Sequence, residues 1–220
     1  KNYKDYDQAL AAMSACDHVT VSTDFLAHRA KQYLPKVTTI LNGLGKDFMS
    51  IGERIYNERK SLNRNQITIG YLCGSSTHNG DFKLIEQSLL NVLQKNSEIK
   101  LILVGPLKFT KEFYRLGKQF EHRSFIPYAD FAKIFLEIDL NLVPLEQNEM
   151  FCQAKSELKF IEAGLCGVAS LVTPTAPHKE AIIDGKSSVF AEDNEWEQKM
   201  ETLVGDRQKL IDIGEEARLS

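Results

Sequence analysis

The stretch Leu101-Ile-Leu-Val104 is apolar at every position and is followed at once by Gly105. A strand with one face in water alternates polar and apolar residues, whereas a continuously apolar strand is typical of a parallel sheet covered by helices on both faces. Other short apolar runs recur from Ile67 onward, and longer amphipathic segments separate them. This alternation predicts strand and helix units repeated around a parallel sheet, which is an α/β fold.

The strands and helices of this sheet can be assigned from the pattern. Strands are expected over residues 67–72, 100–104, 123–126, 140–143, 169–172 and 188–190. Helices are expected over residues 81–94, 110–120, 130–137, 156–166, 177–183, 196–203 and 206–218. In the first of these helices, Ile85, Leu89 and Val92 recur at helical spacing and form one buried stripe. We therefore predict a Rossmann-like sheet of about six strands with helices on both faces.

The first 42 residues have a different organisation. A helix is expected over residues 6–16, a strand over 18–21, a helix over 23–33 capped by Ser22 or Thr23, and a strand over 36–41. The segment Asn42-Gly-Leu-Gly-Lys46 then forms a break with two glycines, and a polar helix over residues 51–62 follows it. We place a domain boundary at about Asn42, with residues 43–220 as the main domain.

Composition limits the classes of function. Of the 220 residues, 43% are hydrophobic and 26% are charged, which is ordinary for a folded globular chain. The net charge of −3 gives no basic excess, so the sequence indicates no nucleic-acid partner. No apolar run reaches the ~18 residues of a membrane span. Because the chain lacks an initiating Met, we expect it to be part of a longer protein.

The four cysteines are scattered and form no closely spaced pair. This pattern predicts free thiols in a reducing compartment, hence a cytoplasmic location, and neither a disulfide framework nor a zinc site. We expect no metal ligands.

The loops that follow parallel strands gather at one edge of the sheet, where ligands bind. The loop Gly74–Gly80 is small and hydroxylated and opens a helix, so its backbone N–H groups can hold an anion. It contains neither a dinucleotide fingerprint nor a P-loop, and its Ser, Thr and Asn side chains could equally serve only as helix caps. His78 in this loop could donate to a phosphate or simply be solvated.

The helix over residues 156–166 carries unexpected charges. With Ser156 as its cap, Lys155, Lys159 and Glu162 share one stripe at spacings of four and three. Lys155 can pair with a diphosphate at the positive helix end, and Glu162 lies about 10 Å further on, which suits a ribose. The alternative is a solvated face. Because the helix leads directly into a strand it should be covered, and buried charges need partners, which favours binding.

Several stretches in order resemble a known family: residues 18–23, 39–43, 69–79, 101–105, 126–128, 139–145, 155–164 and 181–185. Together they are similar to the second, nucleotide-sugar-binding domain of retaining glycosyltransferases of the GT-B fold, family 4 (group 1). The resemblance implies that residues 1–42 are the tail of the acceptor-binding domain and that residues 43–220 bind the donor.

The resemblance also implies an activity. It is the metal-independent transfer of a sugar, with retention, from a UDP-, GDP- or dTDP-sugar to a glycan or lipid-linked acceptor, without a protein nucleophile or a cofactor. The family's leaving diphosphate helps to take the acceptor's proton while cationic groups and helix N–H groups stabilise the developing charge. Peripheral membrane association of the full-length protein is a further expectation. This chain alone should be inactive because most of the acceptor domain is absent.

In the family's Glu-x7-Glu motif the first Glu meets the sugar and the second meets the ribose. Glu162 matches the second, but Ala154 stands at the first, and the usual basic pair is replaced by Gly74-Ser-Ser-Thr-His-Asn79. The resemblance therefore leaves the catalytic roles around the sugar and diphosphate to Lys155 and Glu157, with Ser156. The remaining expected donor contacts are Gly74, Ser75, Ser76, Thr77, His78, Gly105, Leu158 and, at the base, Pro127 and Tyr128.

Two other functions remain open on the sequence alone. Ala154 in place of the motif carboxylate keeps a non-catalytic module possible, one that binds a sugar nucleotide or a protein partner. A sugar-nucleotide epimerase of the same fold matches the Lys155 and Glu162 arrangement less well.

Overall fold

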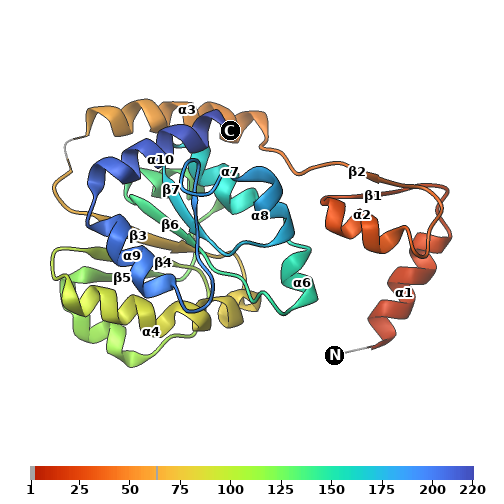
Figure 1. Ribbon diagram of the computed structural model, residues 1–220, viewed down its shortest axis with the longest axis horizontal. Coiled ribbons are helices and arrows are strands. Elements are labelled where there is room, and N and C mark those ends of the chain that lie inside the picture. Colours follow the sequence, from red (N-terminus) through yellow and green to blue (C-terminus); the bar gives the residue numbers. More distant parts are fainter. Residues whose placement is uncertain (1–2, 63) are drawn as a thin grey trace.

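The computed structural model describes residues 3–62 and 64–220 (Figure 1). The main unit is a six-stranded, wholly parallel sheet with the strand order β5-β4-β3-β6-β7-β8. Its strands are β3 (Thr68–Leu72), β4 (Lys100–Val104), β5 (Phe120–Arg123), β6 (Leu140–Val143), β7 (Ala169–Val172) and β8 (Val189–Phe190). The predicted α/β fold is confirmed.

Helices cover both faces of this sheet (Figure 1). Six of the α-helices are α3 (Lys46–Ser61), α4 (Asn79–Lys95), α7 (Leu158–Leu165), α8 (Ala176–Ala181), α9 (Trp196–Val204) and α10 (Arg207–Leu219). The other helical segments of this unit are the 3-10 helices η1 (Ser76–His78), η2 (Lys111–Gln119) and η3 (Ala132–Leu136) and the four-residue helices α5 (Tyr128–Phe131) and α6 (Met150–Gln153).

Strand β4 shows how the sequence positions these layers. Leu101 and Leu103 join the cluster formed with α4 and α9, whereas Ile102 and Val104 join the cluster formed with α3, η3 and α7. Successive side chains of a strand point to opposite faces, so a strand that is apolar throughout fills a core on each side. Helices on both faces are therefore required by the opening stretch of sequence.

The first residues form a separate small unit that projects from the main one (Figure 1). It consists of α1 (Tyr3–Ser14), β1 (Val19–Val21), α2 (Asp24–Ala30) and β2 (Val37–Thr39), with β1 and β2 parallel. Thr23 caps α2, since its Oγ1 accepts from the Leu26 N–H at 3.2 Å. The extended segment that follows β2 connects this unit to the main one.

Several sequence predictions of element position were wrong. Helix α3 begins at Lys46, before the predicted start at residue 51. The third strand lies at Phe120–Arg123 rather than at residues 123–126, because it is an edge strand in which Glu121 pairs with Lys100 at 2.6 Å. Phe125, inside the predicted range, is exposed. The residues from Pro144 to Lys155, expected to be a loop, contain the short helix α6.

The predicted cap of the charged helix was also wrong. Helix α7 begins at Leu158, and the residue at its N-cap position is Glu157, which makes no capping hydrogen bond through its side chain. Ser156 instead accepts a hydrogen bond on Oγ from Asn42 Nδ2 at 2.7 Å, which ties the connecting segment to the start of α7. Lys155 therefore lies before the helix, and the shared stripe of three charges is reduced to Lys159 and Glu162.

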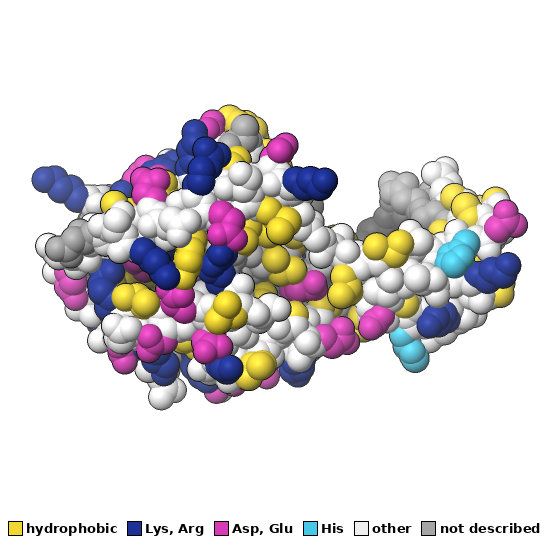
Figure 2. All heavy atoms as spheres, turned by 90° about the horizontal axis from the view of Figure 1, so that it is seen from above, with side chains coloured by type: hydrophobic (Ala, Val, Ile, Leu, Met, Phe, Trp, Pro, Cys, Tyr) yellow, Lys and Arg dark blue, Asp and Glu magenta, His cyan; other side chains and the backbone are white. Residues whose placement is uncertain are grey.

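All four cysteines are unpaired. Within the part of the chain that the structure describes, no helix has the length and apolar character needed to cross a bilayer. Charges of both signs are interspersed over the face seen from above in Figure 2.

Candidate functional site

The candidate site lies where β3 and β6 stand side by side at the centre of the sheet. The chain leaves β3 toward α4 on one face and leaves β6 toward α7 on the other, so the two connections diverge. A crevice opens at such a reversal of strand order, outside the carboxyl ends of the strands, and it is the usual ligand position in open α/β sheets.

A buried carboxylate, Asp81, organises this edge. Its Oδ2 lies 2.8 Å from Lys155 Nζ and 2.8 Å from His78 Nδ1, while its Oδ1 accepts from the Glu146 N–H at 3.3 Å. The Cys152 thiol also donates to Oδ1, at 3.5 Å. Asp81 thus joins the first turn of α4, the loop after β3 and the connection that follows β6.

The electrostatics of this cluster favour its charged form. Burial alone would raise the pKa of Asp81, but the hydrogen bonds from His78 and Lys155, with the charge of Lys155, lower that pKa to about 2. Asp81 is therefore ionised at neutral pH, and it holds Lys155 in place. The Lys155 ammonium also lies 5.3 Å from the centre of the exposed Phe151 ring.

Lys159, in the first turn of α7, differs from Lys155 in its contacts. Its ammonium lies 5.2 Å from the centre of the buried Tyr71 ring, and no carboxylate lies within ion-pair distance of it among the described residues. Burial lowers the pKa of Lys159 to about 8, partly opposed by the charge of Asp81. This cation therefore remains available to an anionic ligand.

Glu162 lies one turn further along α7 and is nearly buried. Burial raises its pKa to about 7, and the charge of Lys159 opposes the shift only partly. No hydrogen bond to its carboxyl group is recorded among the described residues, so the group can accept or donate to a ligand hydroxyl.

A buried histidine, His178, approaches the same region from α8. Its Nδ1 lies 2.7 Å from the Thr173 carbonyl oxygen and therefore carries the proton, which leaves Nε2 as an acceptor. That Nε2 is buried and has no hydrogen-bond partner among the described residues. Burial lowers the pKa of His178 to about 4, and the charge of Lys159 contributes to this shift.

The loop residues predicted from the sequence lie at this edge. Gly74, Ser75, Ser76 and Thr77 are exposed after β3, and His78 contacts Asp81. Gly105 follows β4 with a φ of 114°, and a Cβ there would stand 2.1 Å from the Cys73 carbonyl oxygen, so only glycine fits. The role of Gly105 in the structure is this close approach of two neighbouring loops.

The residues predicted at the base follow the edge strand β5. Pro127 precedes α5 and Tyr128 begins it, and both are exposed. The Tyr128 ring lies 6.1 Å from that of Phe48 on α3.

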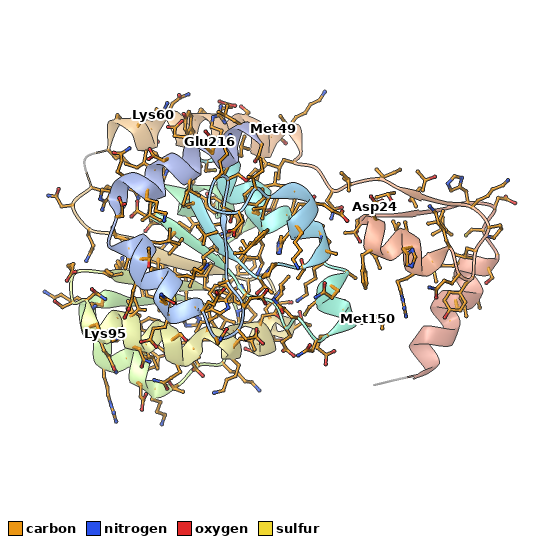
Figure 3. The ribbon with its side chains drawn as sticks, in the orientation of Figure 1. Asp24, Met49, Lys60, Lys95, Met150 and Glu216 are labelled. Atoms are coloured by element: carbon orange, nitrogen blue, oxygen red, sulfur yellow. The ribbon has the colours of Figure 1, made fainter. Side chains whose placement is uncertain are left out.

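Two other predicted residues, Glu157 and Leu158, lie at the start of α7 but in different surroundings. Leu158 is its first residue and is half-buried, next to the turn that carries Lys159. Glu157 is buried and lines a different cavity, together with Leu44, Phe160 and Arg218, rather than joining the Asp81 cluster. The structure therefore brings Lys155 and His78 together but separates them from the Glu157 carboxylate. In Figure 3, Met150 marks α6, just before this segment.

Sequence reasoning missed Asp81 and His178. The spacing of three between His78 and Asp81 places both on one side of a helical turn, and this was the available signal. No sequence pattern indicated His178, because its place in the candidate site depends on burial of its ring in the folded chain. Among the described residues, no group of three or more His, Cys, Asp or Glu side chains could hold a metal ion.

The fold defines an α/β protein with a parallel sheet, and this edge is its candidate ligand site, at the reversal of strand order. Residues 85–220 match the glycosyl transferase-like family, and because the match covers more than half of the chain, the chain belongs to that family. No curated protein matches it.

Solved glycosyltransferases share the fold. Anabaena Alr3699/HepE in complex with UDP and glucose is 18% identical with a TM-score of 0.71, over 94% of this chain and 59% of that one. Sucrose-phosphate synthase from Thermosynechococcus elongatus is 13% identical with a TM-score of 0.71, over 100% and 57%. WaaG, a glycosyltransferase involved in lipopolysaccharide biosynthesis, is 16% identical with a TM-score of 0.68, over 91% and 57%.

These similarities show that the sheet and its helices match domains of GT-B glycosyltransferases. This chain spans between 57% and 59% of the length of these three proteins.

Proposed function

We propose that this chain is the donor-binding part of a glycosyltransferase that moves a sugar from a nucleoside-diphosphate sugar to a glycan or lipid-linked acceptor with retention of configuration. The observation that carries the proposal is Lys159, a half-buried cation at the carboxyl ends of β3 and β6 that has no carboxylate within ion-pair distance among the described residues. Membership of the glycosyl transferase-like family and the UDP bound by Anabaena HepE support a nucleotide sugar as the ligand.

The charges suggest how the diphosphate would be held. Lys155 is already engaged with Asp81, so that carboxylate offsets part of its charge. Lys159 has no such partner in the part of the chain that the structure describes, and with the N-terminus of α7 it offers the stronger attraction to an anion. We assign the diphosphate chiefly to Lys159 and the exposed loop Gly74–Thr77, with Lys155 and His78 at its margin.

The ribose and the sugar occupy the neighbouring positions. Glu162 lies three residues beyond Lys159, with a carboxyl group free to bind the ribose hydroxyls. Ala154 offers no carboxylate for the sugar, so Lys155 and Ser156 are its nearest candidates. Tyr128 and Pro127 would meet the base. Glu157 reaches this site only if it leaves its present cavity.

Catalysis would then follow from charge stabilisation. As the bond between the sugar and the diphosphate lengthens, negative charge grows on the diphosphate, and the ammonium of Lys159 with the N–H groups that open α7 would stabilise it. The diphosphate oxygen would help to take the acceptor's proton, without a metal ion or a protein nucleophile. Residues 1–42 would belong to the acceptor domain, and residues 43–220 to the donor domain of a cytoplasmic enzyme.

Calorimetric titration with UDP, GDP and dTDP tests the proposal. We expect one of them to bind and the other two to bind at least about tenfold more weakly, because base contacts select among them. No transfer is expected from this chain alone. If all three fail to bind, the alternative of a non-catalytic module, which Ala154 keeps possible, replaces the proposal.

The full-length protein provides the second part of the test. It should transfer sugar from the donor that carries the selected nucleotide. Nucleotide binding without transfer from any donor would contradict the enzymatic part of the proposal and leave the binding part intact.

A further inference from the structure

A second cluster of charged residues lies at the opposite edge of the sheet. Asp139 immediately precedes β6, and three arginines surround it: Arg59 on α3, Arg64 between α3 and β3, and Arg207 at the start of α10. They line a cavity of 240 Å³. Because this edge holds the amino ends of the strands, the cavity is separate from the crevice between β3 and β6.

One carboxylate serves all three guanidinium groups. Asp139 Oδ1 lies 2.7 Å from Arg64, 3.7 Å from Arg59 and 3.8 Å from Arg207, while Oδ2 accepts from the Thr68 N–H at 3.0 Å. Three positive charges thus face one negative charge. Burial lowers the pKa of Arg59 to about 10, and the charge of Arg64 adds to this shift.

The other acidic group of the cavity does not offset this excess. Glu215 accepts a hydrogen bond from the Tyr56 hydroxyl and lies 3.5 Å from Lys60. Lys60, on α3 in Figure 3, therefore already uses this carboxylate. The cavity keeps a surplus of positive charge.

Arg207 differs from its two neighbours. Arg59 donates to the carbonyl oxygens of Phe135 and Ile138, and Arg64 donates to that of Leu136. Arg207 has only its long contact with Asp139, and its Nη2 is buried without a hydrogen-bond partner among the described residues. A buried donor without an acceptor is costly, so a ligand that accepts from it is favoured.

We propose that this cavity is a second binding site, for a phosphate group, centred on Arg207. A guanidinium group donates in a fork that matches two oxygens of a phosphate. The cavity is much larger than a water molecule, at about 30 Å³, and lies below the range of about 300–1,000 Å³ of drug-sized pockets, so it suits a small anion. Inorganic phosphate and the phosphate headgroup of a lipid share this chemistry.

Thermal unfolding of this chain in inorganic phosphate, with sodium chloride at matched ionic strength as reference, tests the site. We expect saturating phosphate to raise the unfolding midpoint by about 2–4 °C. Arg207→Gln should abolish the shift, whereas Arg207→Lys should retain a smaller part of it. Arg115→Gln, an exposed arginine on η2, is the matched control and should keep the full shift.

Two further measurements separate this site from the crevice and from a folding defect. Lys159→Gln should retain the phosphate shift, and so should the unchanged chain when a nucleoside diphosphate is already bound. If Arg207→Gln does not fold, the phosphate-induced shift of Arg207→Lys is compared with that of wild type. A shift that persists in Arg207→Gln, an undiminished shift in Arg207→Lys, or loss of the shift in Lys159→Gln would overturn the proposal.

Vesicles distinguish the two sources of phosphate. Sedimentation with phosphatidylcholine vesicles that contain phosphatidic acid, but not with phosphatidylcholine alone, and loss of that binding in the Arg207 variants would identify a lipid headgroup. A phosphate shift without vesicle binding would identify free phosphate. If the chain shows neither a phosphate-induced shift nor vesicle binding, the proposed site is contradicted.

Discussion

The Lys155 ammonium lies 2.8 Å from the Asp81 carboxylate, and Asp81 is almost completely buried at the start of α4. This pair joins the segment after β6 to the loop after β3 across the reversal of strand order. The pair is therefore one of the contacts that hold these two segments together, beside those of Asp81 with the Glu146 N–H and the Cys152 thiol. Its strength can be measured directly.

A double-mutant cycle with Asp81→Asn and Lys155→Met measures this coupling. We expect a coupling free energy of about 2–3 kcal/mol in urea unfolding, because both groups are largely withdrawn from water. The ion pair between Lys133 and Asp130, at 2.6 Å but exposed, is the matched control. It should give less than about 1 kcal/mol. Equal couplings for the two pairs would show that burial of Asp81 adds nothing.

Glu162→Gln should stabilise the protein at high pH. The pKa of Glu162 is raised to about 7 from 4.5, so its contribution to stability is present below pH 4.5 and is lost as the pH rises through 7. The free energy of unfolding of the variant, taken relative to wild type at the same pH, should be about 3 kcal/mol higher at pH 8.5 than at pH 4. The exposed Glu98 provides the control, and Glu98→Gln should show no such dependence. A pH-independent difference for Glu162→Gln would contradict the assignment.

Nucleotide affinity should fall as the pH rises above 8. The pKa of Lys159 is lowered to about 8, so the free protein loses this charge at mildly alkaline pH, whereas bound diphosphate favours the charged form. Titrations between pH 7.5 and 9.5 should show affinity falling by up to about tenfold per pH unit. Lys159→Arg should remove the fall, because its guanidinium remains charged. A fall of the same size in that variant would place the titrating group elsewhere.

Gly105→Ala should disrupt the edge of the sheet. The substituted residue would have a φ of 114°, and its Cβ would stand 2.1 Å from the Cys73 carbonyl oxygen, so backbone must move. We expect a loss of at least about 2 kcal/mol in unfolding free energy. Gly74→Ala, where a Cβ meets nothing within 4 Å, is the matched control and should have little effect on stability. Similar losses for both would contradict the close approach.

The sequence predicted the layers better than it predicted the site. Continuous apolar strands such as Leu101-Ile-Leu-Val104 require cover on both faces, so the α/β sheet follows from hydrophobic pattern alone. The edge strand Phe120–Arg123 was not predicted because its side chains form ion pairs and do not make a continuous apolar run. A period-based search does not detect such a strand.

The sequence predicted that the loops of the candidate site would share one edge of the sheet, but it did not predict their contacts. The loops after β3 and β6 were expected at one edge because parallel strands end there. The pairing of Lys155 with Asp81 joins residues 74 positions apart, and no local pattern specifies it. The buried Nε2 of His178 likewise depends on packing, which becomes apparent only when the chain is folded.

The most direct test of the account is the dissociation constant of the preferred nucleoside diphosphate for Lys159→Gln at pH 7.5, measured by calorimetry beside wild type and Lys118→Gln. Lys118 is exposed and lies just before β5, at the far edge of the sheet. If Lys159 meets the diphosphate, its loss should weaken binding about tenfold to a hundredfold, which corresponds to about 1.4–2.8 kcal/mol, and Lys118→Gln should bind as wild type does. Unchanged affinity in a folded Lys159→Gln protein would contradict the central claim.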